Sequence, residues 1–271
     1  MSKYEEVMAR VWDHYNEARE HFTQHEIVGI FLQGSQNYDL DYAGSDVDTK
    51  LIVVPSFKDI AMNHKPVSTT HVRANEEHID FKDIRLYMQT FRKQNLNFLE
   101  ILFTPYFIIN PLYAQEWGRL VEHREDIAHF NMYRGVQSMK GIALEKYHAM
   151  EHPYPSKIAV LEKYGYDPKQ LHHLKRVEWY LEKYINGDSY ESCLIPEGET
   201  REYLMDIKNG LYNLADARSI ADLAKTHVEE MAAAAYEKYP NEEDANINAL
   251  LDDVQYNIMK IAVQEELKEE S

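Results

Sequence analysis

The sequence predicts an α+β fold, in which a small mixed β-sheet with flanking helices is followed by an all-helical part. Two apolar runs bracket a Gly-Ser dipeptide and an Asp-x-Asp motif, two β-branched segments follow, and only helical periodicity remains beyond Pro111. The chain has 271 residues, enough for one large domain or two modest ones. We therefore expect one domain over residues 1–110 and a helical domain over residues 111–271.

Local patterns define the elements of the first part. Apolar residues at three- and four-residue spacing predict a helix, apolar runs predict buried strands, and Pro55 ends the second strand because it cannot continue a central ladder. A three-residue polar turn between the β-branched segments predicts a hairpin. In order, we expect a helix over 4–22, strands over 27–33 and 46–54 joined by a turn at Gly34-Ser35, a hairpin of 66–73 and 77–81, a helix over 83–94, and a short helix or strand over 97–103.

The second part contains helical patterns only. A run of four alanines at 232–235 favours a helix, and Gly187 and Gly210 fall where helices should stop. The expected helices lie near 112–127, 130–150, 156–164, 167–186, 199–208, 214–238 and 243–268.

The net charge of −17 is unevenly spread. Residues 1–110 carry 11 basic and 16 acidic side chains, residues 177–271 carry 8 and 22, and residues 157–176 carry 5 and 2 together with two histidines. An acidic surface repels a polyanion over a Debye length of about 8 Å, so a long nucleic acid is a poor partner outside the basic segment. A nucleotide accompanied by Mg²⁺ is compatible with this balance.

The composition also indicates the cellular compartment in which we expect the protein. No apolar run approaches the ~20 residues that cross a bilayer, and the polar start predicts no secretory signal peptide. The single Cys193 excludes an internal disulfide and a cysteine-based zinc site. We expect a cytoplasmic protein without a membrane partner, and the oligomeric state stays open.

The Asp46-Val47-Asp48 motif is the strongest indication of chemistry. Side chains two apart on a strand point to the same face, and paired carboxylates stay ionised together most easily with a cation between them. The upstream Gly34-Ser35 offers backbone N–H groups and one hydroxyl to a phosphate. Metal-binding acids beside a phosphate-binding turn indicate phosphoryl or nucleotidyl chemistry. Ordinary surface acids at the start of a strand are the alternative.

Asp80 is the best candidate for a third acid, because it lies inside an apolar segment where an unpaired charge is costly. The nearby Asp83 lies at the expected start of the following helix, where an N-cap role explains its presence equally well. Lys50 lies two residues beyond Asp48, so we expect its ammonium on the same face, where it neutralises the acids in the metal-free state or contacts a triphosphate. A solvated strand lysine is the alternative for Lys50. We assign Glu100, in another apolar stretch, a structural role.

A basic helix is the second informative segment. Asp167-Pro168 is typical of a helix start. Cationic positions then recur at three- and four-residue spacing and share one face: Lys169, His172 or His173, and Arg176. A triphosphate or an RNA end needs such a face. A solvated helix face is the alternative.

As a set, these motifs resemble the DNA polymerase β-like nucleotidyltransferase superfamily. They are a strand, Gly34-Ser35, about ten residues, Ser45-Asp46-Val47-Asp48, a second strand, and then Ile79-Asp80-Phe81. Gln36-Asn37-Tyr38, residues 97–103 and the basic helix are similar to a bacterial and phage branch labelled as polymerase-β-like enzymes of an RNA repair pathway. The chain departs from that branch at Asp39, where a glycine is expected, and from a generic member at the polar Thr49-Lys50.

The resemblance implies that Asp46, Asp48 and Asp80 hold Mg²⁺ or Mn²⁺. It also implies that Gly34 and Ser35 grip the triphosphate of an NTP. Two ions about 3.5–4 Å apart stabilise the entering and leaving oxygens of an in-line displacement, and Asp80 is also a candidate general base. The expected reaction transfers a nucleoside monophosphate from an NTP to an acceptor hydroxyl and releases pyrophosphate.

The acceptor stays open between an RNA 3′ end, a small molecule such as an antibiotic, and a protein side chain. Two other classes of function stay open as well: a catalytically silent nucleotide-binding module, and a toxin or regulatory protein whose acidic helical end binds a partner. Three intact candidate acids argue against the first class. A solvated helix face explains the acidic charge without any partner.

Overall fold

The computed structural model describes residues 2–42 and 44–269. Its contacts divide the chain into two compact units. The first contains Met1–Asn37, Asp41–Phe130 and Glu243–Ser271, and the second contains Tyr38–Leu40 and Asn131–Glu242. The chain therefore enters the second unit briefly, soon after the Gly-Ser turn, and returns to the first unit for its last helix.

The first unit is built on a five-stranded mixed sheet in the order β3-β4-β2-β1-β5. β2 and β4 are parallel, and the other neighbouring strands are antiparallel. The strands are β1 (Glu26–Gln33), β2 (Asp48–Val54), β3 (Ser68–Val72), β4 (His78–Asp83) and β5 (Phe107–Ile109). This architecture confirms the predicted α+β fold class, and β3 and β4 confirm the predicted hairpin.

The sequence interpretation missed β5, a three-residue strand that pairs with the edge of β1. Its close approach depends on Gly29. A Cβ at this position would lie 2.9 Å from the Ile108 carbonyl oxygen and 2.9 Å from Ile109 Cδ1. A glycine inside an apolar strand is the sequence signal of such an approach.

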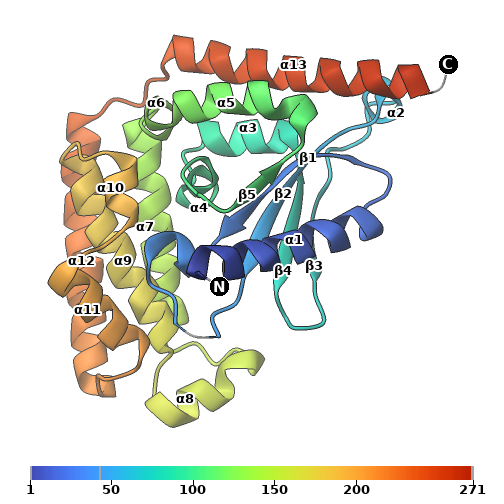
Figure 1. Cartoon of the computed structure of the whole chain (residues 1–271). Coiled ribbons are helices and arrows are strands. Elements are labelled where there is room, and N and C mark those ends of the chain that lie inside the picture. Colours follow the sequence, from blue (N-terminus) through green and yellow to red (C-terminus); the bar gives the residue numbers. More distant parts are fainter. Residues whose placement is uncertain (1, 43, 270–271) are drawn as a thin grey trace. The chain divides into compact units, whose positions relative to one another are not determined.

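Helices cover both faces of this sheet. α1 packs its apolar stripe against one face, in a core shared with Leu51 and Phe81. On the other face, the ring centroid of Phe31 lies 4.4 Å from that of Trp117 in α5. α13 lies along α3 and α5 (Figure 1). The helices of this unit are α1 (Lys3–His21), α2 (Phe57–Ala61), α3 (Ile84–Arg92), α4 (Leu96–Leu99), α5 (Ala114–Glu122), α6 (Arg124–Ala128) and α13 (Ala245–Glu269).

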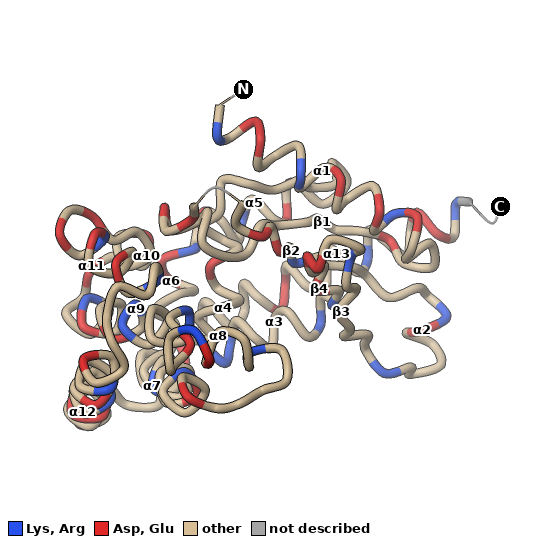
Figure 2. The backbone as a smooth tube through the Cα atoms, turned by 90° about the horizontal axis from the view of Figure 1, so that it is seen from below, with Lys and Arg blue, Asp and Glu red and all other residues tan. Residues whose placement is uncertain are grey.

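The second unit consists of helices, of which α7, α9 and α12 pack against one another. Asp167 caps α9 as predicted, since its Oδ1 accepts the Lys169 N–H at 2.9 Å. Gly187 and Gly210, with φ of +89° and +71°, follow α9 and α11 where helix ends were expected. Acidic residues recur along α11 and α12, with basic residues between them (Figure 2). The helices are α7 (Met132–Ala149), α8 (Ile158–Tyr164), α9 (Pro168–Ile185), α10 (Tyr190–Leu194), α11 (Gly198–Lys208) and α12 (Leu214–Lys238).

The contacts do not divide the chain at residue 110, because α5, α6 and α13 belong to the unit that contains the sheet. Ion pairs connect α13 to this unit: Arg92 Nη2 lies 2.6 Å from Asp252 Oδ1, and Arg119 Nη2 lies 2.7 Å from Asp253 Oδ2. The predicted domain boundary at residue 110 stays a prediction. Each helix within residues 2–42 and 44–269 is too short or too polar to span a membrane.

Replacing Gly29 with Ala tests the approach of β5. The new methyl group would meet a backbone oxygen that has little room to move, so we expect a loss of about 2–3 kcal/mol in the free energy of unfolding, measured with urea. Gly118→Ala in α5 is the control, because nothing lies within 4 Å of an added Cβ. It should stabilise the protein by up to ~1 kcal/mol. A Gly29→Ala variant as stable as the wild type would contradict this account.

Candidate active site

Side chains of β2 and β4 form a polar face of the sheet. Lys50 pairs with Asp80 in the parallel ladder. Two residues earlier on each strand, the His78 backbone N–H donates to Asp48 Oδ1 at 2.9 Å. Because side chains alternate along a strand, these four residues lie on the same face. The same-face placement expected for Lys50 is confirmed by its ion pair with Asp80, in which Nζ and Oδ2 are 3.4 Å apart.

The Gly34-Ser35 turn adjoins this face at the start of β2. Gln33 pairs with Asp48 at the end of the β1–β2 ladder. Gly34 has a φ of +116°, a backbone conformation that favours glycine, and a short 3₁₀ helix follows it. Gln36 Nε2 donates to the Asp46 carbonyl oxygen at 2.7 Å. The residue after the turn therefore contacts the backbone of the first predicted acid.

The three predicted acids differ in their surroundings. Asp46 is exposed. The Asp48 side chain is 39% exposed, and its Oδ1 lies 3.2 Å from His78 Nδ1. The Asp80 side chain is 36% exposed and accepts a hydrogen bond from Thr70 Oγ1 at 2.7 Å, in addition to its ion pair with Lys50. All three carboxylates reach solvent, and Asp80 has the most protein partners.

Their donor chemistry fits a hard cation. Mg²⁺ is commonly held by one or two carboxylates together with substrate phosphates, and Asp46 and Asp48 offer such oxygens beside the turn. Within residues 2–42 and 44–269, no three histidine, cysteine, aspartate or glutamate side chains are grouped as ligands of one ion. Asp80 already accepts one partner on each carboxylate oxygen, Lys50 and Thr70, and a cation would compete with the Lys50 ammonium for it. The metal role of the three acids stays a prediction.

Lys50 is 2% exposed, so the solvated-lysine alternative is wrong. Burial lowers its pKa to about 8, and the nearby Asp80 carboxylate partly opposes this shift. Its Nζ lies 4.2 Å from the centroid of the Phe98 ring, in a cation–π contact. A buried ammonium on the acid-bearing face is thus compensated by one carboxylate and one aromatic ring.

Glu77 forms the densest polar network of the described residues, and sequence reasoning missed it. The residue is 2% exposed. Oε1 accepts the Val47 N–H at 3.0 Å and a bond from Arg10, and Oε2 accepts from His14 Nε2 at 2.9 Å, Arg73 Nη1 at 2.9 Å and Asn75 Nδ2 at 2.7 Å. A buried carboxylate is stable only with such compensation.

This network holds alternate positions of the segment that carries Asp46 and Asp48. Three contacts do so: Arg10 Nη1 with the Ser45 carbonyl oxygen at 3.0 Å, the Val47 N–H with Glu77, and Thr49 Oγ1 with His14 Nδ1 at 2.9 Å. Positions 45, 47 and 49 are thus tied to the α1 side of the sheet. Within β2, the Asp48 side chain therefore points to the opposite side. The strand expected over 46–54 begins only at Asp48, so Asp46 precedes it and alternation does not determine its direction.

His14 completes the network as a neutral ring. It is fully buried, and desolvation lowers its pKa to about 3. A neutral ring donates a hydrogen bond from Nε2 to Glu77 and accepts a hydrogen bond from the Thr49 hydroxyl at Nδ1. The sequence contained one signal of this role, because His14 falls three residues after Val11 and four before Ala18, within the apolar stripe of α1.

The cationic residues predicted on α9 lie in the second unit. His172 is buried, its Nδ1 lies 2.9 Å from the Leu204 carbonyl oxygen, and burial lowers its pKa to about 4. Arg176 is also buried and lies 3.7 Å from the Tyr38 ring centroid. Lys169 is exposed. The solvated-face alternative is therefore wrong for His172 and Arg176, and the nucleotide-binding role of all three residues stays a prediction.

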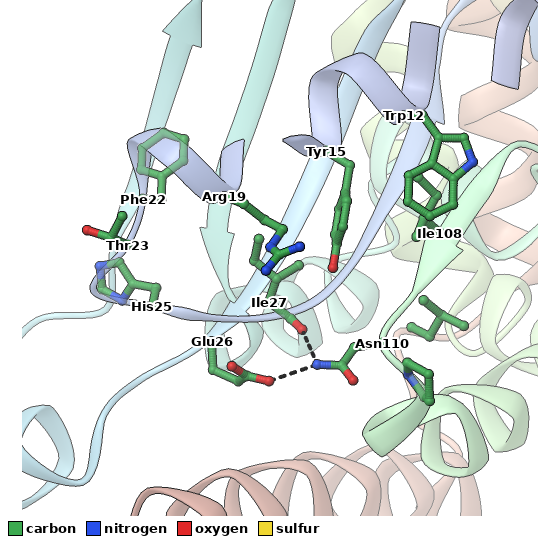
Figure 3. A pocket seen from close by; sticks show the side chains of 12 residues that line it. Trp12, Tyr15, Arg19, Phe22, Thr23, His25, Glu26, Ile27, Ile108 and Asn110 are labelled. Atoms are coloured by element: carbon green, nitrogen blue, oxygen red, sulfur yellow. Dashed lines mark hydrogen bonds between the residues drawn. The ribbon is translucent and has the colours of Figure 1, made fainter. Parts of the chain in front are cut away.

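A cavity of about 730 Å³ lies elsewhere in the first unit, near the start of β1. Trp12, Arg19 and other residues of α1 line it together with the end of β5, and Asn110 Nδ2 donates to Glu26 Oε1 at 2.7 Å at its edge (Figure 3). None of the predicted site residues lines this cavity. The candidate acids belong instead to the solvent-reaching face at the other end of β1.

Comparison with known proteins adds a slight likeness. No family model and no curated protein matches the chain. Among solved structures, it is similar to a nucleotidyltransferase-like protein from Exiguobacterium sibiricum, with 12% identity and a TM-score of 0.29 over 81% of this chain and 73% of that chain. A likeness of this size assigns no residue, and membership of the polymerase β-like superfamily stays a prediction.

Replacing Glu77 with Gln should destabilise the first unit by about 3 kcal/mol. The amide would turn N–H groups toward existing donors and remove the charge that compensates Arg10 and Arg73. Urea denaturation followed by circular dichroism measures the loss. The neighbouring, exposed Glu76→Gln is the matched control and should stay within about 0.5 kcal/mol of the wild type. Equal stability of the two variants would refute the structural weight given to Glu77.

The buried neutral His14 also predicts a pH dependence of stability. Its folded pKa of about 3 lies below its unfolded value of 6.5, so below pH 6.5 the unfolded chain binds a proton that the folded chain does not. Stability should therefore fall with falling pH, by about 1 kcal/mol between pH 6 and pH 5 from this residue alone. The His14→Gln variant lacks this contribution, and its stability should change less over the same interval. Parallel curves for the two proteins would contradict the prediction.

Proposed function

We propose that this protein is a metal-dependent nucleotidyltransferase, which moves a nucleoside monophosphate from an NTP to an acceptor hydroxyl and releases pyrophosphate. One observation carries the proposal: Asp48 pairs with Gln33, next to the Gly-Ser turn, and Asp80 lies on the same face of the adjacent parallel strand. Gln36, which follows the turn, bonds the Asp46 carbonyl. Oxygen ligands for a cation and N–H donors for a phosphate then lie side by side.

In this reaction the acceptor oxygen bonds to the α-phosphorus of the NTP. The bond from that phosphorus to the bridging oxygen breaks, and pyrophosphate leaves with the electron pair. The backbone N–H groups at Gly34 and Ser35 and the Ser35 hydroxyl donate to triphosphate oxygens. The acceptor proton passes to water or to the Asp80 carboxylate. Mg²⁺ or Mn²⁺, when held by Asp46 and Asp48, supplies positive charge that neutralises the reacting phosphates.

A specific observation favours a second candidate, a nucleotide-binding module without catalysis. Asp80 is bonded to Lys50 and Thr70, and Asp48 is bonded to His78. Acids that keep these hydrogen-bond and ion-pair partners would bind no second metal ion. The same site would then hold a nucleotide at the Gly-Ser turn without transferring it.

Replacing Asp48 with Asn separates the two candidates. We expect the wild type, incubated with each labelled NTP, Mg²⁺ and total RNA or cell extract, to release pyrophosphate, and the variant to be at least 100-fold slower because it lacks a metal-binding carboxylate. Chelation with EDTA should stop the wild-type reaction. Asp13→Asn, an exposed acid on α1, is the control and should keep full activity. Nucleotide binding without pyrophosphate release under any metal condition would favour the silent module.

A further inference from the structure

Lys82 has no assigned role, yet it lies on the same face as the candidate site. It follows Asp80 by two residues on β4 and pairs with Ile52 of β2 and with Ser68 of β3. Its side chain is half-buried. Because the strand alternates, Lys82 and Asp80 point to one side of the sheet.

Lys82 and Lys50 contact the same aromatic ring. Their Nζ atoms lie 4.0 Å and 4.2 Å from the Phe98 centroid, so the two nitrogens are at most about 8 Å apart. Two charge-assisted hydrogen bonds of about 2.8 Å, one on each side of a phosphate group, span gaps up to this size. One phosphate can therefore bridge the two ammonium groups when both approach the ring from the same side.

The local charge also favours an anion. Asp80 pairs with Lys50, and within residues 2–42 and 44–269 no carboxylate lies within ion-pair distance of Lys82. Lys50 thus has a carboxylate partner, with Asp48 also nearby, whereas the half-buried Lys82 has no ion-pair partner among the described residues. An aromatic face attracts cations but supplies no negative charge. A bound anion is what completes the balance.

This lysine pair is distinct from the Gly-Ser turn. The turn adjoins Asp48, whereas Lys82 lies at the level of Ile52, four residues further along β2. At about 3.3 Å per residue, the backbones at these two levels are about 13 Å apart. The turn and the lysine pair thus offer two separate positions for phosphate, with Asp80 between them.

We propose that Lys82, supported by Lys50 across the Phe98 ring, binds a phosphate group of the acceptor substrate. This inference rests on the proposed function, in which the Gly-Ser turn takes the phosphates of the donor NTP. It selects among the acceptors that the sequence left open: the acceptor hydroxyl belongs to a phosphate-bearing molecule, such as an RNA end or a sugar phosphate. A neutral small molecule or a protein side chain would leave the lysine pair without its anion.

Binding of ribose 5-phosphate, followed by ³¹P NMR on the full chain without divalent ions, tests the site apart from catalysis. We expect Lys82→Gln to weaken binding at least fivefold and Lys82→Arg to retain it. Lys58→Gln removes an exposed lysine of α2 and should bind within twofold of the wild type. Ser35→Ala alters the turn, which the proposed function assigns to donor phosphates, and it should weaken binding less than Lys82→Gln does. A wild type that binds no ribose 5-phosphate, or a loss caused by Ser35→Ala and not by Lys82→Gln, would overturn the proposal.

A second arm identifies the source of the phosphate. A short single-stranded RNA with a free 3′ hydroxyl is titrated against the same variants. Binding that depends on Lys82 and is tighter for the RNA assigns the site to a nucleic-acid end, and tighter binding of ribose 5-phosphate assigns it to a small sugar phosphate. If no NTP yields pyrophosphate while Lys82-dependent binding persists, the proposed function fails and the phosphate site stands. If Lys82→Gln leaves pyrophosphate release unchanged with every phosphate-bearing acceptor tested, the proposed function stands and this inference fails.

Discussion

The Glu77 carboxylate accepts hydrogen bonds from α1, from the β3–β4 hairpin and from the backbone just before β2. Removed from water, the charge depends on these donors, and donors such as the His14 ring and the Val47 N–H have no solvent to replace it. The helix, the hairpin and the acid-bearing segment are therefore stable in this arrangement only together. The sheet around the candidate site is organised by one buried polar network in addition to its apolar core.

The same network determines which way the candidate acids point. Within β2 the side chains alternate, and the bond from His14 assigns Thr49 to the α1 side. Asp48 and Lys50 therefore lie on the other side, and Asp46 precedes the strand. A shift of one residue would bury the acids and expose the apolar positions, so the network and the apolar core favour the same register.

Charge on the opposite face changes along the strands. Acids predominate beside the Gly-Ser turn, and lysines predominate where β2 and β4 approach Phe98. Asp80 lies between the two regions and is bonded to a lysine and a threonine. Such a gradient suits the binding of a cation and of phosphate groups on one surface. The acids attract the cation at one level of the sheet, and the lysines attract phosphate at another.

Local patterns in the sequence determined α1, β1, β2, the hairpin and the cap of α9, since periodicity, turn residues and capping act between neighbours in the chain. They also indicated Asp46, Asp48 and Asp80, and the placement of Asp48 and Asp80 on one face follows from alternation once β2 and β4 are paired. Tertiary structure alone decided that three residues pair with β1 as β5, that α13 returns to the sheet, and that Glu77 joins His14 to Val47. Each of these depends on partners distant in the chain, and no local pattern encodes which distant partner a buried charge or a short strand will find.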